Sequence, residues 1–482
     1  MKLRYLLLLW LFPCLGAYAQ IELSNFTATG RAGISTTLAT DYQAQGINPA
    51  NLAFEPTYEG KHVTIGFGEL GFSTYSDALS KINLRTAVFN PNHKLTSQEK
   101  YQTALDFANK GVTVNLDFLY GGYSWQKPSG GMGFCFTMRE RAQLYTKLNP
   151  NTADILYNGW NSAYFRDSLL TEIDTTGGGF KVDTIGAIAR APKLLSDLLD
   201  GTRLSLAWFR EYGFGYGVNI LHNFDLKLDM GVGVKYIQGI GFLDIESKGA
   251  NMTAFIAASP GFSFITLSKL PVSANTDTNN IGFLPNPAGH GVGFEVGFTA
   301  ILKEKYIFSA AVNDIGSVTY QTNAYTASDT LLTNIATNGL DSYNFFRADQ
   351  FEGFQEDVIK WRGLERRSYS LPTKLRLGAA ITKEKYNAGL ELVIPLNKVS
   401  GNFVKPFYSI GGEYKGISWL RVGSGLMFGG NYNKTFLVPL GVTFIIKNGL
   451  WEIGVASRDI ITYMKGKNPI LSVSSGFLRF RF

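Results

Sequence analysis

Large apolar and aromatic side chains alternate with glycine or a single charged residue along many segments of this 482-residue chain. In Tyr212–Ile220 (YGFGYGVNI) and Gly291–Phe298 (GVGFEVGF), every second position is aromatic or aliphatic. This period of two predicts half-buried β-strands. The composition agrees, because 53 glycines, 14% aromatic residues and only 17% charged residues are typical of a large antiparallel β protein. An α/β enzyme or a helical bundle is disfavoured.

The smaller face of these strands indicates which kind of β protein this is. A soluble β-sandwich turns its large apolar residues toward a shared core and exposes Lys, Glu and Thr. Here the second face is glycine with isolated charges, which are Glu211, Lys235, Glu295, Arg376, Glu391, Glu413 and Arg421. Apolar residues outside and small or charged residues inside are what the lipid and lumen faces of a membrane barrel require. We therefore predict an all-β fold, a transmembrane antiparallel β-barrel with these charges in its lumen; a large soluble β protein is the alternative.

The last strand-like segment, Leu471–Phe482 (LSVSSGFLRFRF), sharpens this prediction. Arg479 and Arg481 share one face of it, and apolar residues occupy the other. An arginine on the lipid face costs roughly 2–4 kcal/mol near the bilayer midplane, so both arginines are predicted to face the lumen or the rim. The terminal Phe482 resembles the assembly signal of bacterial outer-membrane barrels.

We count about fourteen to fifteen strand-like segments, and because bacterial barrels close with an even number we predict fourteen strands. Three interruptions are too long for turns, and each contains a helical candidate. The interruptions are residues 74–110, 147–202 and 322–370, and the candidates are Ser97–Asn109, Pro192–Asp200 and Ala327–Ala336. We expect these to be long, partly helical extracellular loops, either solvated or available to partners.

The N-terminus has the pattern of an export signal. Lys2 and Arg4 precede an apolar stretch, and Ala17-Tyr18-Ala19 is a small-residue cleavage site. Residues 1–19 are therefore predicted to be a signal peptide, which leaves one thiol, Cys135, and no internal disulfide. With an export signal and a barrel pattern, the predicted location is the outer membrane of a Gram-negative bacterium. No Lys/Arg run points to nucleic acid as a partner.

Residues 20–60 do not alternate, and we predict that they form a hatch inside a barrel spanning residues 61–482. A barrel this wide leaves an aqueous hole unless something fills it. Asn48-Pro49-Ala50 predicts a defined bend, because Pro49 fixes its own φ and restricts Asn48. A disordered leader is the alternative. Speculative ligand-binding positions in the hatch are its apolar side chains, Phe26, Leu38, Ile47, Leu52 and Phe54.

Short motifs add a family resemblance. The G-R-A-G stretch at Gly30–Gly33 and the N-P-A bend at Asn48–Ala50 resemble the hatch of FadL-like long-chain fatty-acid outer-membrane transporters. Phe308–Val318 (FSAAVNDIGSV) and Leu371–Ala379 (LPTKLRLGA) are similar to two strand motifs of that superfamily, which includes PorV-like components of type IX secretion. The resemblance implies a monomeric fourteen-stranded barrel with an N-terminal plug. The chain departs from the family pattern at Asn51, where many members have Gly.

Catalytic signatures are missing from the sequence. The four histidines form no metal-binding spacing, and there is no G-x-S-x-G or C-x-x-C motif. We therefore predict no enzyme activity, no cofactor and no metal. The lumen charges are balanced in sign, which favours structural pairing over a selective ion pathway. The segment 349–367, acidic first and basic later, is either a solvated loop or a docking surface.

Two functions fit these predictions. In the first, the barrel transports hydrophobic small molecules across the outer membrane, past the hatch. In the second, it is a binding or scaffold component of an outer-membrane secretion or surface-assembly complex, with protein partners at loops 147–202 and 322–370. Outer-membrane lipid is the expected surrounding in both.

Overall fold

The computed structural model describes residues 23–482 except 91, 175–180, 250, 261–269, 272, 280–283, 344–357, 403–404, 431–435 and 465–469. The predicted signal peptide, residues 1–19, and residues 349–357 of the acidic-to-basic segment lie outside the described residues. Within the described ranges, no helix has both the length and the apolar character needed to cross a membrane.

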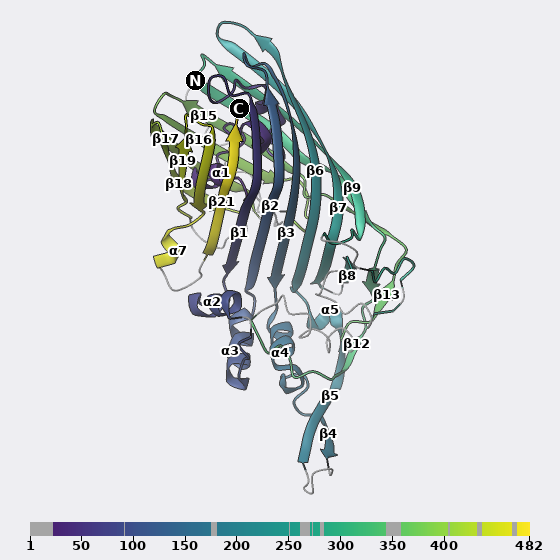
Figure 1. Ribbon diagram of the computed structural model, residues 1–482. Coiled ribbons are helices and arrows are strands. Elements are labelled where there is room, and N and C mark those ends of the chain that lie inside the picture. Colours follow the sequence, from purple (N-terminus) through teal and green to yellow (C-terminus); the bar gives the residue numbers. More distant parts are fainter. Residues whose placement is uncertain are drawn as a thin grey trace, which may run out of the picture.

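Fourteen strands of the described chain pair in antiparallel fashion around a closed ring (Figure 1). They are β1 (Val63–Ser76), β2 (Gly111–Gln126), β3 (Met132–Lys147), β6 (Arg203–His222), β7 (Leu226–Lys248), β9 (Gly289–Leu302), β10 (Tyr306–Tyr320), β15 (Lys374–Thr382), β16 (Tyr386–Pro395), β17 (Phe407–Ile417), β18 (Leu420–Gly429), β19 (Leu440–Ile446), β20 (Trp451–Ser457) and β21 (Ile470–Arg481). β21 pairs with β1, with Phe67 opposite Leu478. This pairing removes the sheet edges that would otherwise bind another chain. The predicted all-β barrel of fourteen strands is confirmed.

The two faces of the wall follow the predicted alternation. On β6, Tyr212 and Phe214 are exposed while Gly213 and Glu211 are buried. On β9, Phe294 and Phe298 are likewise exposed. The apolar face therefore points outward and the face of glycine and charged residues points inward.

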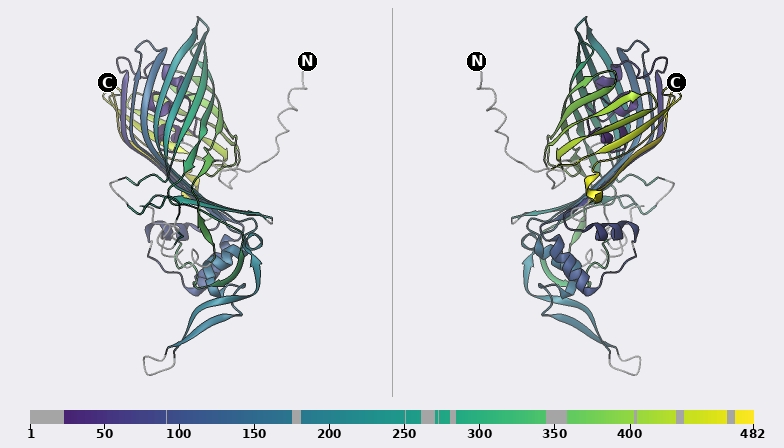
Figure 2. Two further views of the ribbon diagram at one scale, coloured as in Figure 1. Left: turned by 90° about the vertical axis from the view of Figure 1, so that its right-hand side faces the viewer. Right: turned by 90° about the vertical axis from the view of Figure 1, so that its left-hand side faces the viewer.

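The two ends of the barrel differ. Turns of a few residues, such as 303–305 and 383–385, join strands at the end where the C-terminus lies, and all the long connections lie at the opposite end (Figures 1 and 2). Exposed aromatic residues gather near the short turns; they are Tyr306, Tyr386, Tyr414 and Trp419.

The long connections form a cap beyond the barrel, drawn at the bottom of Figure 1. Its elements are α2 (Lys81–Phe89), α3 (Ser97–Phe107), α4 (Pro150–Asn158), η4 (Gly159–Asn161), α5 (Leu195–Leu198) and the three-stranded sheet of β4 (Leu169–Asp174), β5 (Lys181–Leu194) and β12 (Leu331–Ile335). The short strands β8 (Asn251–Ala258), β11 (Ala324–Ala327), β13 (Trp361–Gly363) and β14 (Arg367–Ser370) extend the wall toward the cap. A last short helix, α7 (Ile461–Met464), precedes β21.

Of the three predicted helices, the first is present and the other two were largely wrong. α3 begins after Thr96, whose side chain forms a capping box with Glu99. The predicted helix Pro192–Asp200 shrinks to Leu195–Leu198, because the residues before it continue β5. Ala327–Ala336 contains the strand β12, which pairs with β5. In both cases pairing with a distant strand outweighs local helix propensity.

Closure through β1 and β21 gives a testable register. The double variant Phe67→Cys/Leu478→Cys is expected to form a disulfide under mild oxidation, because the two residues are direct cross-strand partners on the outer face. The matched control is Phe67→Cys/Val473→Cys, because Val473 instead pairs with Phe72, five residues further along β1. Non-reducing electrophoresis after cyanogen bromide cleavage measures the cross-link. Equal cross-linking of both pairs would contradict the register.

Candidate functional site

The N-terminal segment, residues 23–54, lies inside the barrel, where its short helices are drawn in purple (Figures 1 and 2). It contains α1 (Phe26–Gly30) and the 3-10 helices η2 (Asp41–Ala44) and η3 (Pro49–Ala53), and almost all of its residues are buried. The segment fits because the inner wall carries glycine where it passes. A Cβ added at Gly66, for example, would overlap the ring and hydroxyl of Tyr42. The N-terminal segment therefore packs against the glycine face of the strands.

The predicted bend at Asn48-Pro49-Ala50 is the start of η3. The Asn48 side chain accepts a hydrogen bond from Ala50 N (3.2 Å) and donates to Thr36 O (2.9 Å). Asn51 forms two further hydrogen bonds within the segment: its Nδ2 donates to Ala39 O (2.9 Å) and to Thr36 O (3.1 Å). The departure from the family pattern at Asn51 thus has a structural role, since glycine has no side-chain amide to hold residues 36–39.

Glu391 on β16 accepts several hydrogen bonds from the N-terminal segment. Its carboxylate accepts hydrogen bonds from the backbone N–H groups of Ser35 and Thr36 (each 3.1 Å at the shorter contact) and from both of their hydroxyl groups. Arg376 lies beside it, with Nη1 3.8 Å from Oε1. All of these residues are buried. Glu391 therefore satisfies a stretch of backbone that forms no strand ladder of its own.

Three further wall carboxylates bind the segment in the same way. Glu295 accepts from Gly46 N (2.9 Å), and Asp117 accepts from Ser24 N (3.0 Å). Glu69 accepts from the Tyr42 hydroxyl and from Gln43 Nε2 (3.1 Å). Acidic residues spaced around the wall thus serve as acceptors for the polar groups of the segment.

Arginines of the last strand complete the attachment. Asp41 Oδ2 lies 2.6 Å from Arg479 Nη2 and 3.3 Å from Arg481 Nη2. Glu452 on β20 pairs with the same two arginines, at 3.2 and 2.6 Å. Arg31 reaches Glu413 at 3.5 Å. Residues from both ends of the sequence therefore meet in one buried ionic cluster.

A second ionic cluster lies among the middle strands and centres on Lys235. Its ammonium contacts Glu295, Asp314 (2.7 Å) and Glu211 (3.7 Å). Arg141 pairs with Glu211 and with Asp314 (3.4 Å), and Lys374 lies 3.7 Å from Asp314. The cluster contains three cationic and three anionic side chains, so this layer of the lumen is formally neutral. The cations are Lys235, Arg141 and Lys374, and the anions are Glu211, Glu295 and Asp314. The predicted lumen charges of β6, β7 and β9 are thus placed together and engaged with one another.

Sequence reasoning missed several members of these clusters. They are Asp41, Glu69, Asp117, Arg139, Arg141, Asp314, Lys374 and Glu452. Arg139 and Arg141 flank Glu140, so that charges occupy consecutive positions of β3 and hide the alternation. Asp314 could have been found, because it is the acidic residue of the D-I-G motif in Phe308–Val318.

The long-loop end of the lumen is apolar and aromatic. By register and alternation, Phe242, Phe255, Tyr320 and Tyr369 share the inward face with the glycines of β9. Their rings pack at centroid distances of 4.4 Å for Phe242–Tyr369 and 5.1 Å for Phe242–Tyr320. An apolar core beneath the cap, which includes Phe107 and Tyr157, continues this region outward. The lumen therefore changes from apolar to charged between the cap and the N-terminal segment.

The cap contains a buried charged residue as well, Lys100. Lys100 on α3 donates to Asn338 O at 2.8 Å and thereby joins α3 to the segment that follows β12. Burial lowers the pKa of Lys100 below its ordinary value.

Two hollows lie in this part of the molecule, one against the segment and one on the outer side of the wall. The inner one, which we call the recess, has a volume of about 200 Å³ and lies between the segment and the wall near the short turns. Its lining includes Leu38 and Phe54 of the five predicted ligand-binding residues. Phe26 packs on Gly454 and Gly476 of the wall, and Leu52 packs on Gly215 and Gly217. Ile47 is also buried, so the five residues are not brought together around one cavity.

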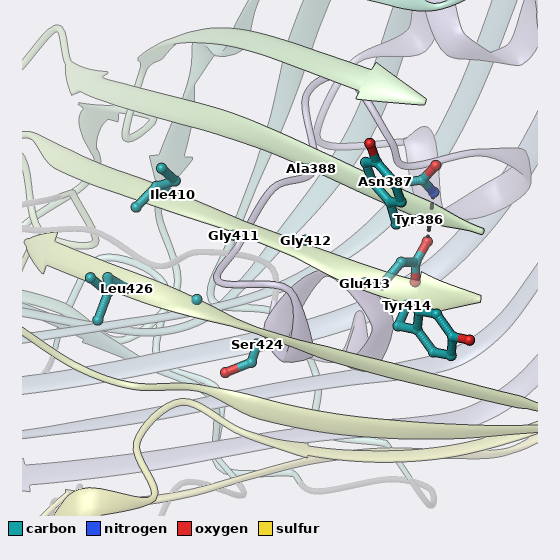
Figure 3. A pocket seen from close by; sticks show the side chains of 11 residues that line it. Tyr386, Asn387, Ala388, Ile410, Gly411, Gly412, Glu413, Tyr414, Ser424 and Leu426 are labelled. Atoms are coloured by element: carbon teal, nitrogen blue, oxygen red, sulfur yellow. Dashed lines mark hydrogen bonds between the residues drawn. The ribbon is translucent and has the colours of Figure 1, made fainter. Parts of the chain in front are cut away.

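The outer hollow is a groove of about 530 Å³ on β16, β17 and β18 (Figure 3). The small residues Ala388, Gly412 and Ser424 are cross-strand partners at its floor. Tyr386 and Tyr414 stand at one end, and the hydrogen bond from Asn387 to Glu413 (2.9 Å) is drawn beside them. Asn387 and Glu413 line the recess as well, so only one layer of wall separates the two hollows.

Neither hollow contains a catalytic constellation that we recognise. Across the part of the chain that the structure describes, no group of three or more His, Cys, Asp or Glu side chains could hold a metal ion. Cys135 is buried in β3 beside the Gln45 side chain, at 3.8 Å. Of the histidines, His290 forms a hydrogen bond of 2.7 Å with Tyr236 on the outer face.

Comparison with known protein families identifies the family of this chain. The model of a family of unknown function, DUF5723, matches residues 53–434. The chain belongs to this family. Comparison with the curated proteins finds no match. The family description names no activity, so the function has to be inferred from the structure.

Several solved structures align with this chain over most of its length. The toluene transporter TodX of Pseudomonas putida has a TM-score of 0.44 and 10% identity, covering 98% of this chain and 99% of that one. The toluene transporter TbuX of Ralstonia pickettii gives 0.41 and 11%, covering 96% and 99%. A FadL homologue of Pseudomonas aeruginosa gives 0.39 and 10%, covering 97% of each chain. At these values our fold assignment rests on the strand pairing, which has the fourteen-stranded architecture expected from the FadL-like resemblance.

Glu391 provides a test of how the N-terminal segment is held. Glu391→Ala removes a buried ionised acceptor and leaves Arg376 and two backbone N–H groups without it, which we expect to cost roughly 3–5 kcal/mol. Hydrogen exchange of the peptide covering residues 30–40, followed by mass spectrometry, should become faster by at least tenfold. The matched control is Glu384→Ala, an exposed carboxylate in the turn between β15 and β16. Unchanged protection in Glu391→Ala would show that the wall carboxylates do not hold the segment.

Proposed function

We propose that this protein is a non-enzymatic outer-membrane barrel that passes small hydrophobic molecules, with the N-terminal segment as its hatch. The observation that carries the proposal is a closed fourteen-stranded wall whose lumen is filled by a segment held only through side chains and hydrogen bonds. A barrel of this many strands has an interior wider than its own wall side chains fill, so the segment is what closes it.

A membrane location is supported by the outer surface. Exposed apolar residues line the outward faces of the strands; they include Phe67, Phe136, Val232, Phe294, Phe308, Leu390, Ile410 and Val455. A soluble protein rarely exposes apolar surface over a contiguous region of this extent. The exposed aromatic residues near the short turns correspond to the interfacial girdle of membrane barrels. Outer-membrane lipid is therefore the first partner that we propose, around a single barrel.

A movable hatch is supported by the way in which the segment is attached. No strand ladder joins the described residues of the segment to the wall. The attachment is instead a set of separate hydrogen bonds and ion pairs, whose partners on the wall stay in place when the segment shifts. Irregular backbone of this kind is tolerated at membrane depth inside a protein or a wet cavity.

Hydrophobic cargo is supported by the order of environments along the lumen. From the cap inward, the side chains form first the apolar core beneath α2, α3 and α4 and then the aromatic cluster of Phe242, Phe255 and Tyr320, so a path opened on this side would run along apolar groups. The middle layer of the lumen offers ions no site of one sign, because the charges around Lys235 match in number. Small apolar molecules are thus the class that this entrance favours.

Deletion of residues 20–55 tests the hatch. The shortened barrel should conduct ions in planar bilayers, because the lumen loses its filling while the strand ring stays intact. The control is deletion of residues 169–194, which removes the cap hairpin of β4 and β5 and leaves the segment in place. A barrel that stays electrically tight without residues 20–55 would refute the hatch.

A scaffold role is the second candidate, and exposed apolar residues of the cap favour it. Ile82 and Phe89 on α2 are 76% and 75% exposed, and the cross-strand pair Ile173 and Val182 at the far end of β4 and β5 is 60% and 61% exposed. Such residues suit a protein partner at the cap. Ile173 and Val182 belong to loop 147–202 and the exposed Leu331 to loop 322–370, whereas Ile82 and Phe89 belong to loop 74–110.

Native mass spectrometry separates the two candidates. The full-length protein, carrying an affinity tag in the exposed turn 223–225 between β6 and β7, is extracted from its own membrane in mild detergent. A transporter is expected as a monomer carrying adducts of small-lipid mass, and these adducts should disappear after deletion of residues 20–55. A stoichiometric protein companion that is lost when Ile82 and Phe89 are changed to Ser would instead establish the scaffold role. Substitution of the exposed Lys385 to Gln serves as the control for nonspecific loss.

A further inference from the structure

The lining of the recess between the N-terminal segment and the wall contains more basic than acidic side chains. Four arginines line it, Arg31, Arg421, Arg479 and Arg481, and the only carboxylate in its lining is Glu413. Asp41 and Glu452 pair with two of these arginines but do not line the recess. Glu69 is directed to Tyr42 and Gln43. The surface that the recess presents is therefore more positive than its surroundings.

Arg421 is the arginine with the fewest partners. Its Nη2 donates to the Tyr58 hydroxyl at 2.8 Å, and its guanidinium lies 5.5 Å from the centre of the same ring. No ion pair between described residues includes Arg421, whereas Arg31, Arg479 and Arg481 each have a carboxylate within 3.5 Å. A guanidinium with five N–H donors therefore faces the recess with most of its hydrogen-bonding capacity available.

Hydroxyl groups surround the same space. Five threonines line the recess, Thr27, Thr37, Thr40, Thr57 and Thr382. The side-chain oxygens of Thr37 and Thr382 are buried without a hydrogen-bond partner among the described residues, and so is Arg479 Nε. Buried polar atoms without partners are costly, so a group that accepts several hydrogen bonds is favoured here.

We infer that the recess is a binding site for a small oxyanion, a carboxylate or a phosphate, with Arg421 as its main ligand and the threonine hydroxyls as additional donors. Arginine binds both groups through paired N–H donors, and hydroxyls complete the shell. The volume of about 200 Å³ corresponds to about seven water molecules. That space accommodates a phosphate ion or the acidic end of a small amphipathic molecule, but not a whole lipid.

The position of the recess fixes the side from which the anion comes. Ile307, Thr382 and Asn387 in its lining lie next to the short turns, at the end of the barrel opposite the cap. The anion is therefore a soluble one reaching that end of the barrel, or the head of a molecule leaving through it. The site goes beyond the proposed transport and does not depend on it, because a barrel that never opens would still bind an anion there.

Isothermal titration calorimetry of the detergent-solubilised protein without its signal peptide tests this site at low chloride, with inorganic phosphate and with butanoate as separate probes. We expect the wild type to bind at least one probe, and Arg421→Gln to weaken binding about tenfold, as loss of a charge-assisted hydrogen bond implies. Lys385→Gln, which removes the same charge from an exposed turn at the same end, should bind as the wild type does. Binding of phosphate alone would identify an inorganic anion site, and binding of butanoate alone a carboxylate site.

A second variant guards against a folding defect in Arg421→Gln. Thr382→Val keeps every arginine and removes one partnerless hydroxyl, so it should weaken binding several-fold while leaving the heat-modifiable electrophoretic mobility of the barrel unchanged. Two results would overturn the inference. One is that the wild type binds neither probe. The other is that a folded Arg421→Gln and Thr382→Val both bind with wild-type affinity.

Discussion

The structure depends on polar groups of the N-terminal segment finding partners inside the barrel. The segment is mostly irregular and buried, so its backbone N–H groups cannot be satisfied by a ladder or by bulk water. Turns and short helices within the segment satisfy many of them, and Glu391, Glu295 and Asp117 accept from those of Ser35, Thr36, Gly46 and Ser24. Burying these carboxylates has its own cost, which nearby cations offset; Arg376 beside Glu391 and Lys235 beside Glu295 are the clearest cases. The charges of the inner wall are thus explained by what fills it.

The two faces of each wall strand have different roles, one formed by glycine and the other by large apolar residues. The inward glycines leave room for the segment, and the outward aromatic residues form an apolar outer surface. Neither face could be exchanged for the other, because a one-residue shift in register would turn Tyr212 into the lumen and Glu211 outward. The register, the fit of the N-terminal segment and the apolar outer surface are therefore set by the same alternation.

This alternation explains which parts of the fold could be predicted from the sequence. A period of two is a local signal, so the strands and the facing of their side chains could be predicted; the count of fourteen to fifteen segments became fourteen only through the rule that bacterial barrels close with an even number. The strand β12 could not, because its pairing with β5 depends on residues far away in the chain. The same applies to the ion pair between Asp41 and Arg479, which are 438 positions apart. Sequence placed the charges on the inward face but could not say which of them would meet.

The ion pairs also bear on what kind of molecule can use the lumen. The lumen is apolar and aromatic toward the cap, the middle layer around Lys235 is neutral and internally paired, and the far end presents Arg421 and hydroxyl groups. A fully apolar molecule would form no favourable polar contact with Arg421 and the hydroxyl groups, and a small ion would form none with the apolar region near the cap. A molecule with an apolar body and one acidic group matches the whole sequence of environments. If transport and the anion site are both correct, they therefore describe the same cargo at two points of its path, with the acid group bound where the hatch meets the wall.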